Sequence, residues 1–284
     1  MQLALEKGYG KLMLIWGNCL VKNEGRYLWF AVKSTIEFLD KILIWDTGSS
    51  DDTVAIIKLL QKEYPQKIEF KEIGGVDAKQ FTKARQAMLD KSKCDWVFIL
   101  DGDEVWWEDS MKSIIKKIKS NKELEYIVSP YYSVIGDIYH YQEELAGEYN
   151  LLGEKGHLNI RFVNKNIPDL HFEKPYGAEG FFDIEGKRIQ DRDPNKAVFL
   201  DYPYLHFSNI QRSSFKKADS MVMQRNRKIR HEIGSKFTKD FKYPEVFYKE
   251  KPDLVPNPWI AMSNNYRIRA IVETPLRKLK RRIR

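Results

Sequence analysis

Apolar runs alternate with amphipathic stretches along the first hundred residues. Four apolar runs have the length and composition of strands buried on both faces: 12–21, 41–45, 67–73 and 96–100. Between them, apolar residues recur at helical spacing, and we predict helices over these parts of the chain: 28–39, 53–63, and a third through Phe81, Ala84 and Met88. Turn and N-cap residues at 47–52 support the start of the second helix.

Strands that alternate with helices indicate an α/β fold in which parallel strands are joined by right-handed crossovers. The expected core is a Rossmann-like, mainly parallel sheet flanked by helices. In such sheets the ligand crevice lies beyond the carboxyl ends of the strands. The polar residues that follow the apolar runs, at 22–24, 46 and 101–104, should therefore meet at one edge.

The pattern is looser after residue 120. We predict strands over 126–135, 158–164 and 197–207, and a polar helix over 213–232. A Pro-containing stretch and a basic tail follow. The simplest division is a catalytic domain over 10–210 and a helical C-terminal region with the basic tail over 211–284.

Composition fits a soluble globular protein, with 43% hydrophobic and 31% charged residues. Cys19 and Cys94 offer neither a disulfide framework nor metal-ligand spacing, so we expect buried free thiols in a reducing compartment. The apolar run 12–16 is too short to span a bilayer, and no cleavage site follows it. The expected location is the cytoplasm, at the inner face of the membrane if the tail binds lipid.

The formal net charge of +8 is concentrated at the end of the sequence. From residue 267 onward there are eight basic residues and one acid, Glu273, which is a net charge of +7. The rest is close to neutral, so no nucleic-acid partner is implied. Apolar residues interspersed in the tail suit an anionic membrane surface, and a solvated terminus is the alternative. Pro275 should divide the tail into two short helical segments.

The sharpest chemical signal is a strand that leads into Asp101-Gly102-Asp103-Glu104. Carboxylate oxygens are hard ligands that suit Mg²⁺ or Mn²⁺, and such sites leave coordination positions for phosphate oxygens and water. Gly102 would let the backbone approach a bulky ligand closely. An ordinary acidic loop after a strand is the alternative interpretation.

Four motifs in order resemble family 2 glycosyltransferases of the GT-A fold. They span residues 19–24, 45–53, 81–85 and 99–104, and the resemblance is close over about 12–110. One departure is Gln86, where the family often has asparagine. The resemblance implies a nucleotide-sugar donor, with uracil as the expected base, and a glycan or lipid-linked acceptor of the kind used in cell-envelope glycan biosynthesis.

The resemblance also assigns roles to individual residues. Those expected to hold the donor are Val21, Lys22, Asn23, Glu24, Asp46, Gly48, Arg85 and Asp101. Within this set, Asp46 would accept from the base or its sugar, Gly48 would keep the turn tight, and Arg85 would neutralise the diphosphate. Asp103 would bind the metal directly, and Asp101 would contact the ribose or the metal. His206 is similar to a late histidine near the metal or diphosphate, or is a structural histidine.

Inversion at the anomeric carbon is expected in this family, and it requires one carboxylate base. The base should follow the metal motif, in the segment that covers the acceptor. The candidates are Glu179, Glu173 and Asp183, with Glu179 favoured because a strand with an arginine, Ile160-Arg161-Phe162, precedes it as in relatives. Trp106-Trp107 would form an apolar wall for the acceptor sugar or pack in the core.

Two other classes share parts of this pattern. The run into Asp101 also satisfies the haloacid-dehalogenase phosphatase signature, with Asp101 as nucleophile, but that motif normally opens its domain. A non-catalytic nucleotide-sugar-binding relative would keep the fold without turnover. A dinucleotide-binding dehydrogenase is disfavoured, because no Gly-x-Gly-x-x-Gly follows the first strand.

Overall fold

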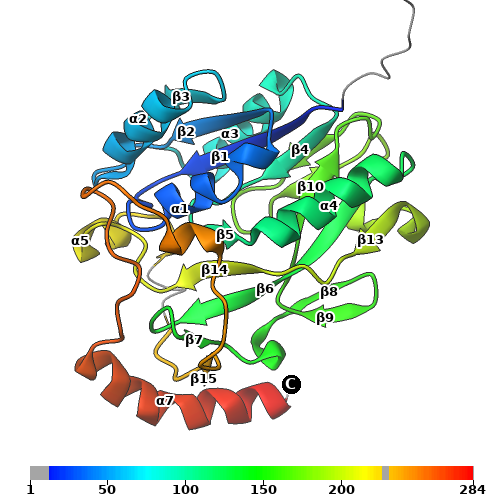
Figure 1. Ribbon diagram of the computed structural model, residues 1–284. Coiled ribbons are helices and arrows are strands. Elements are labelled where there is room, and N and C mark those ends of the chain that lie inside the picture. The colour runs from blue at the N-terminus through cyan, green and yellow to red at the C-terminus, as the bar shows by residue number, and fades with distance from the viewer. Residues whose placement is uncertain (1–12, 226–229, 284) are drawn as a thin grey trace, which may run out of the picture.

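The computed structural model describes residues 13–225 and 230–283. Its first half alternates strands and helices (Figure 1). These elements are β1 (Ile15–Val21), α1 (Leu28–Lys33), β2 (Lys41–Asp46), α2 (Thr53–Glu63), β3 (Ile68–Glu72), α3 (Ala78–Lys91) and β4 (Trp96–Ile99).

The second half is richer in short strands. Its strands are β5 (Glu104–Trp106), β6 (Tyr126–Ile135), β7 (His140–Tyr141), β8 (Tyr149–Leu151), β9 (Glu154–Gly156), β10 (Leu158–Asn164), β11 (His171–Glu173), β12 (Gly180–Phe182), β13 (Ala197–Phe199), β14 (Tyr204–Asn209) and β15 (Ser235–Lys236). Its α-helices are α4 (Glu108–Ser120), α5 (Lys216–Ser220) and α7 (Asn264–Ile283). Single turns of 3₁₀ helix cover Ile36–Phe38, Glu144–Ala146, Ile189–Asp191, Pro194–Lys196 and Glu245–Tyr248.

One mixed sheet organises the described residues. It contains 11 strands, and its main path runs β15-β7-β6-β10-β4-β1-β2-β3. The pairs β4–β1, β1–β2 and β2–β3 are parallel, as the alternation of strands and helices predicts, whereas β10 is antiparallel to both β4 and β6. The predicted α/β fold with a mainly parallel central sheet is confirmed.

Side chains of the central strands alternate between the two faces of the sheet, with the main hydrophobic core on one face and two smaller clusters on the other. On β4, Trp96 and Phe98 pack with residues of α1, α2 and α4, whereas Val97 and Ile99 face the other side, where Leu89 of α3 packs. All four residues of β4 are apolar and buried, because helices cover both faces of the sheet there.

The predicted strand over 197–207 is two strands. β13 and β14 pair in parallel with successive parts of β6, and residues 200–203 between them belong to neither strand. Pro203 lies in this break, where it has no ladder hydrogen bond to donate.

The prediction of a helix over 213–232 was wrong for most of the described part of that segment. The named α-helix in this part is α5, of five residues, and residues 226–229 of the predicted helix lie outside the described part. The Asp219 carboxylate accepts hydrogen bonds from the backbone N–H groups of Arg212 and Ser213 and from the Arg225 side chain. The segment therefore folds around a buried charge.

The prediction that Pro275 splits the tail was also wrong. α7 is continuous from Asn264 to Ile283 with Pro275 inside it. The missing N–H of proline removes one helical hydrogen bond, but the helix is held on both sides of that point. Tyr266 donates to the carbonyl of Arg230, and Arg281 pairs with Glu232.

The C-terminal segment shares the main core. Phe237, Val246, Phe247 and Val255 belong to the same hydrophobic cluster as residues of β1, α1 and α4. Both cysteines are free, Cys19 buried and Cys94 partly buried. No helix in the described ranges is long and apolar enough to cross a membrane.

Candidate active site

A cavity of about 870 Å³ opens at the carboxyl ends of β1 and β4. Its lining also comes from β6, β10 and β14, from the β11–β12 hairpin and from the segment after residue 211. Most of the predicted donor, metal and catalytic residues line this cavity. Besides Asp101, they are Val21, Lys22, Glu24, Arg85, Asp103, Glu179 and His206. Asp101 lines it too, so the ends of β1 and β4 meet here as predicted, whereas Asp46 at the end of β2 does not line the cavity.

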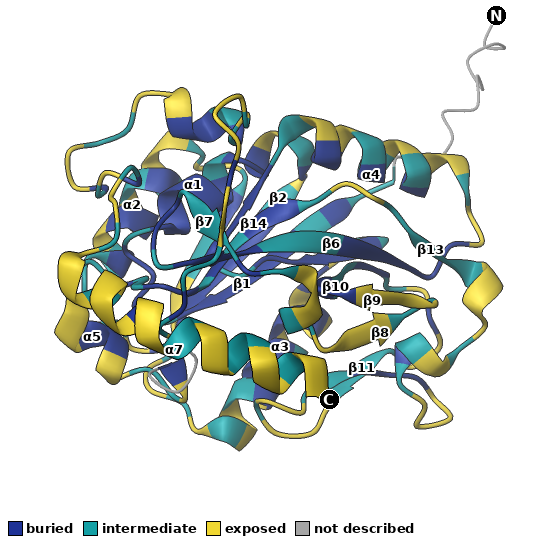
Figure 2. Ribbon diagram, turned by 90° about the horizontal axis from the view of Figure 1, so that it is seen from below, coloured by how far each residue is buried: buried dark blue, intermediate teal, exposed yellow. Residues whose placement is uncertain are grey.

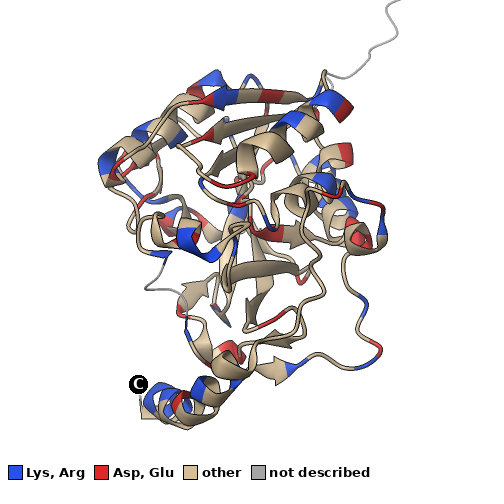
Figure 3. Ribbon diagram, turned by 90° about the vertical axis from the view of Figure 1, so that its left-hand side faces the viewer, with Lys and Arg blue, Asp and Glu red and all other residues tan. Residues whose placement is uncertain are grey.

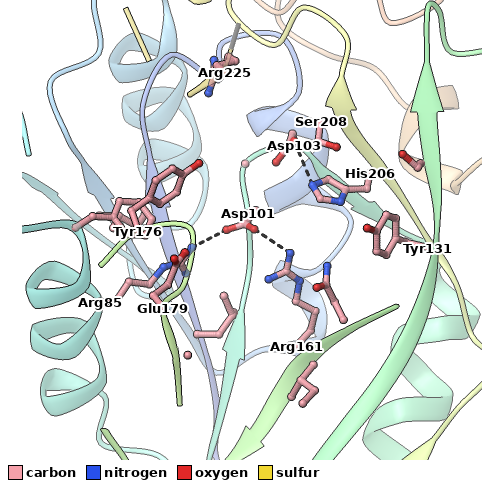
Figure 4. Close-up of a pocket in the computed structure, with 18 of the residues that line it drawn as sticks. Arg85, Asp101, Asp103, Tyr131, Arg161, Tyr176, Glu179, His206, Ser208 and Arg225 are labelled. Atoms are coloured by element: carbon pink, nitrogen blue, oxygen red, sulfur yellow. Dashed lines mark hydrogen bonds and ion pairs between the residues drawn. The ribbon is translucent and has the colours of Figure 1, made fainter. Parts of the chain in front are cut away.

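Asp101 lies between two arginines in the centre of the cavity (Figure 4). Its Oδ1 accepts from Arg85 Nη2 at 2.7 Å, and its Oδ2 accepts from Arg161 Nη2 at 2.9 Å. Burial alone would raise the pKa of this carboxyl, but the guanidinium groups of Arg161 and Arg85 outweigh it and hold the pKa far below its usual range.

Asp103 is buried and lies beside both a histidine and an arginine. Its Oδ2 is 3.4 Å from Nε2 of His206 and also pairs with Arg212. Burial would raise the pKa of Asp103, yet Arg212 and His206 together lower it well below its usual value. Its Oδ1 has no hydrogen-bond partner among residues 13–225 and 230–283.

Two buried glutamates flank the aspartates. Glu24 pairs with Arg225 and lies 3.6 Å from Arg212, and Glu104 pairs with Arg161. Burial raises the pKa of each carboxyl to about 7, against the opposing charge of these arginines. Four carboxylates and four guanidinium groups thus lie together in one desolvated cluster.

Three of the predicted donor residues shape the loops behind the cavity and do not line it. Asp46 Oδ2 accepts from the N–H groups of Gly48 and Ser49, each at 2.8 Å, and Gly48 has a φ of 84° that favours glycine. Asn23 donates to the carbonyl of Ala218 and accepts from the N–H of Ser50. Asp46 Oδ1 is buried without a partner in the described part of the chain.

The three candidate bases occupy different surroundings on or after the β11–β12 hairpin. Glu179 lies in the turn of the hairpin, lines the cavity and accepts from the N–H of Gly177. Glu173 is exposed and lies 3.1 Å from His171. Asp183 is buried, pairs with Arg192 and accepts from two N–H groups of its own turn, so it is not brought to the cavity.

Helix α3 fixes the position of this hairpin. Thr82 Oγ1 donates to the carbonyl of Lys174 at 2.6 Å, and Gln86 Oε1 accepts from the N–H of Phe172 at 2.7 Å. Gln86, the residue that departs from the family pattern, therefore holds the hairpin that carries Glu179.

The structure favours the core-packing alternative for Trp106-Trp107 and adds a contact at Gly102, which also lines the cavity. Trp106 is fully buried in the main core, and Trp107 packs on Phe241 and donates to the carbonyl of Lys242, so neither forms a wall of the cavity. Gly102 is needed for a close contact within the protein itself, because a Cβ there would lie 2.9 Å from Cγ of Glu24.

Sequence reasoning gave no site role to three arginines of the cluster. Arg161 serves there only as a landmark, although a charge inside the strand β10 is a visible signal. Arg212 and Arg225 carry no such signal, since Arg225 falls in the segment predicted as a polar helix and both reach the cavity only through the fold. Arg225 Nη2 donates to the carbonyl of Lys22 at 2.8 Å and to Glu24, so it bridges the loop after β1.

The side chains around Asp103 can be compared with the ligands that a divalent cation needs. Asp103 and His206 provide a carboxylate and an imidazole side by side, and the unpartnered Oδ1 of Asp103 is a buried oxygen that needs a partner. In the described residues, no three His, Cys, Asp or Glu side chains are grouped as a complete metal site. The residues therefore fit a cation that takes its remaining ligands from a phosphate-bearing ligand and water.

Residues 20–177 match the model of the family described as glycosyl transferase family 2, which is more than half of the chain. This match covers β4, the acidic loop and the start of the β11–β12 hairpin. The match favours a glycosyltransferase over the haloacid-dehalogenase phosphatase considered from the sequence.

Two curated relatives match parts of the chain. A TPR repeat-containing protein of Synechococcus elongatus is 23% identical over 181 residues, which are 62% of this chain and 37% of that protein. The SPbeta prophage-derived glycosyltransferase SunS of Bacillus subtilis is 25% identical over 114 residues, which are 39% of this chain and 26% of that protein. The matches thus cover well under half of the length of each relative.

Solved structures of sugar transferases are also similar. S. aureus TarS in complex with UDP-GlcNAc has a TM-score of 0.47 and 13% identity, and the match covers 74% of this chain and 62% of that chain. The mannosyltransferase PcManGT from Pyrobaculum calidifontis in complex with GDP-Man and Mn²⁺ has a TM-score of 0.45 and 12% identity, with 68% and 56% covered.

Proposed function

Because the chain belongs to glycosyl transferase family 2, we propose that it transfers a sugar from a nucleoside-diphosphate donor, expected to carry uridine, to an acceptor hydroxyl group. The observation that carries this proposal is the cluster of paired carboxylates and arginines in one cavity at the strand ends. Arginines suit a diphosphate, and carboxylates suit a sugar or a hard cation.

The donor would lie along the loop after β1. Val21, Lys22 and Glu24 line the cavity there and would contact the nucleoside, while Asn23, Asp46 and Gly48 hold the loops that shape its site. Arg85, which reaches the cavity from α3, would pair with the diphosphate.

We propose that Mg²⁺ or Mn²⁺ is held by Asp103, with His206 and Asp101 beside it. A divalent cation bound there would supply positive charge to the oxygens of the leaving diphosphate. Arg212, which pairs with Asp103, would then share this carboxylate with the cation or move to the phosphates.

We propose Glu179 as the base that takes the proton of the acceptor hydroxyl. The acceptor oxygen forms a bond to the anomeric carbon while the bond from that carbon to the diphosphate oxygen breaks. The electron pair of the broken bond leaves with the diphosphate, and the proton ends on a Glu179 carboxylate oxygen. One displacement from the opposite face inverts the anomeric centre. Glu173 is the second candidate, whereas Asp183 is disfavoured by its burial away from the cavity.

We propose that the acceptor is a glycan or a lipid-linked molecule. The sugar transfer would take place at the cytoplasmic side of the membrane. Residues 10–210 would form the catalytic domain, with 211–284 as its C-terminal region. Arg212 and Arg225 from that region line the cavity, so the region would also take part in donor binding.

Calorimetric titration of UDP into the protein with and without Mn²⁺ tests this function. We expect binding that depends on the metal. Asp103→Ala should weaken it by more than the roughly 10- to 100-fold that an outer-shell change costs a metal site, because a direct ligand is lost. Asp109→Ala, which removes an exposed carboxylate of α4, is the matched control.

Affinity for UDP that is unchanged in Asp103→Ala would remove the metal assignment. A wild-type protein that binds no nucleoside diphosphate under any metal condition would contradict the function itself. Slow hydrolysis of UDP-sugars by the wild type would separate a transferase from a non-catalytic binding protein.

A further inference from the structure

Helix α7 exposes a continuous apolar stripe to solvent. Its members follow one another at helical steps of three or four residues: Ile268, Val272, Leu276, Leu279 and Ile283. Their side chains are all more than half exposed, from 57% at Leu279 to 77% at Ile283. Large exposed apolar surfaces of this kind are rare on proteins that have no partner there.

The opposite face of α7 anchors the helix to the body of the protein. Ala270 is fully buried, Thr274 accepts from the N–H of Ile233, and Arg281 pairs with both Glu232 and Glu143. Because this face is fixed, the orientation of the apolar stripe is fixed as well. In the view from below, α7 lies in the foreground, with many of its residues coloured as exposed (Figure 2).

Basic residues border the stripe on both sides. At about 100° per residue, Arg269 and Lys280 lie along one side, and Lys278 and Arg282 along the other. Arg269 pairs with Glu273, whereas the other three form no ion pair within the described ranges. Figure 3 shows these charges gathered on α7, at the end of the molecule away from α2 and α3.

We propose that α7 is a membrane-docking helix that lies in the plane of an anionic lipid surface. Its apolar stripe would enter the acyl boundary, and its flanking cations would meet lipid phosphates. A second copy of the chain suits this face less well. Two such helices packed stripe to stripe would bring two sets of cations together, with Glu273 as the one acid on each helix to offset them.

Docking through α7 would also set where the cavity faces. Gln142 lines the cavity and donates to Glu232 at 3.2 Å, and Glu232 pairs with Arg281 of α7. Ser133 and Asn209, which also line the cavity, bond to the same Gln142. A short polar network therefore joins the cavity to the helix, so α7 on a bilayer holds the cavity close to the lipid.

Flotation of the full chain with lipid vesicles tests the proposal. We expect binding to phosphatidylcholine vesicles that contain about 30% phosphatidylglycerol, and little binding to phosphatidylcholine alone. Binding at about 0.1 M salt should fall at about 1 M, where the Debye length shrinks to roughly 3 Å.

Two double variants separate the contributions of the stripe and the cations. Leu276→Ser with Leu279→Ser removes apolar surface without changing charge and should weaken binding about tenfold or more. Lys278→Gln with Lys280→Gln should weaken it about 25-fold, or fivefold for each lysine. The matched controls are Ile184→Ser with Leu254→Ser, and Lys116→Gln with Lys119→Gln on α4.

The leucines are exposed, so far-UV circular dichroism and thermal unfolding of the variants should match the wild type. Absence of wild-type binding to anionic vesicles would overturn the proposal, as would wild-type binding by both α7 variants. A wild-type dimer that dissociates in Leu276→Ser with Leu279→Ser, without vesicle binding, would assign the stripe to a second copy of the chain.

Discussion

Arg212 is the residue on which two carboxylates of the cavity depend, because its guanidinium contacts both Asp103 and Glu24. Breaking a buried ion pair on one side typically costs about 3–5 kcal/mol, since a charge is left buried and unpaired. The cluster is therefore stable only as a whole. Each of the four acids is paired with at least one guanidinium group, while one oxygen of Asp103 lacks a hydrogen-bond partner in the described residues.

The proposed base gives the first prediction at this scale. Glu179→Gln should lower turnover by about 10²-fold or more, because an amide cannot accept the proton, while UDP affinity stays unchanged. Steady-state rates together with calorimetry measure both quantities.

Two further variants keep this assignment testable. Glu185→Gln, an exposed change in the next turn, should behave as the wild type in both assays. Normal turnover in Glu179→Gln together with slow turnover in Glu173→Gln would move the assignment to Glu173.

His157 gives a prediction about pH. Burial lowers the pKa of this cavity histidine from 6.5 to about 4, although a hydrogen bond to the Glu143 carbonyl opposes the shift. Between these values the unfolded chain holds more protons, so stability rises with pH across this window. The free energy of unfolding therefore falls as the pH drops from 6.5 towards 4, and the whole pKa shift of His157 corresponds to a loss of about 3 kcal/mol.

Urea unfolding at several pH values measures this effect. His157→Gln keeps a donor for the carbonyl and should flatten the dependence between about pH 4 and pH 6.5. His171→Gln is the control. The contact with the Asp169 carbonyl raises the pKa of His171, so the loss of this histidine should not flatten the rise of stability between about pH 4 and pH 6.5. An unaltered slope in His157→Gln would contradict the prediction.

At the scale of elements, packing decides which short segments reach the cavity. The β11–β12 hairpin has few residues of its own in the core, and α3 holds it through Thr82 and Gln86. α7 is likewise too polar on average to fold alone and depends on its contact face.

The contact between Gly136 and α7 gives a prediction about that helix. A Cβ at Gly136 would lie 2.9 Å from Cε1 of Tyr266 and 3.1 Å from Cε of Met262. Gly136→Ala should therefore loosen α7, because the Tyr266 hydroxyl is held by the Arg230 carbonyl and its ring cannot move freely. Amide hydrogen exchange across residues 264–283 should become faster.

Gly153→Ala is a matched control. Gly153 has a φ of 85°, close to the 77° of Gly136, so alanine meets similar backbone strain, about 1 kcal/mol. No atom lies within 4 Å of its Cβ position among those the structure describes, so α7 should be unaffected. Equal exchange rates in the two variants would show that Tyr266 adapts.

At the scale of the whole molecule, the two halves of the chain enclose one cavity. Strand ends from the first half supply most of the carboxylates, and the segment after residue 211 supplies Arg212 and Arg225. A ligand bound between them should stabilise both parts together.

Thermal unfolding tests this coupling. UDP with Mn²⁺ at about 100 times its dissociation constant should stabilise the protein by about 2.7 kcal/mol, in a single transition. Removal of the metal with EDTA should abolish most of this gain. The same stabilisation by UDP without metal would contradict the metal dependence, and a separate unmoved transition would indicate an independent C-terminal region.

The sequence by itself determined the central sheet. The apolar runs 41–45 and 96–100 predict strands covered by helices, and the helical spacing over 53–63 predicts a helix; these segments are β2, β4 and α2 within one or two residues. It also determined that Asp46, Asp101 and Asp103 follow strand ends, because parallel strands place their carboxyl ends at one edge. The division near residue 210 and the roles of the site residues stay predictions.

Only the tertiary structure decided how those acids are balanced. Arg161, Arg212 and Arg225 come from a late strand and from the segment after residue 211, and their ion pairs with Asp101, Asp103 and Glu24 join residues 60 to 201 positions apart. The local hydrophobic pattern indicates which face of a helix or strand is buried. It does not indicate which distant charged residue a side chain of that element will contact. The continuity of α7 through Pro275 has the same cause, since contacts with Glu232 and Ile233 outweigh a local preference to break.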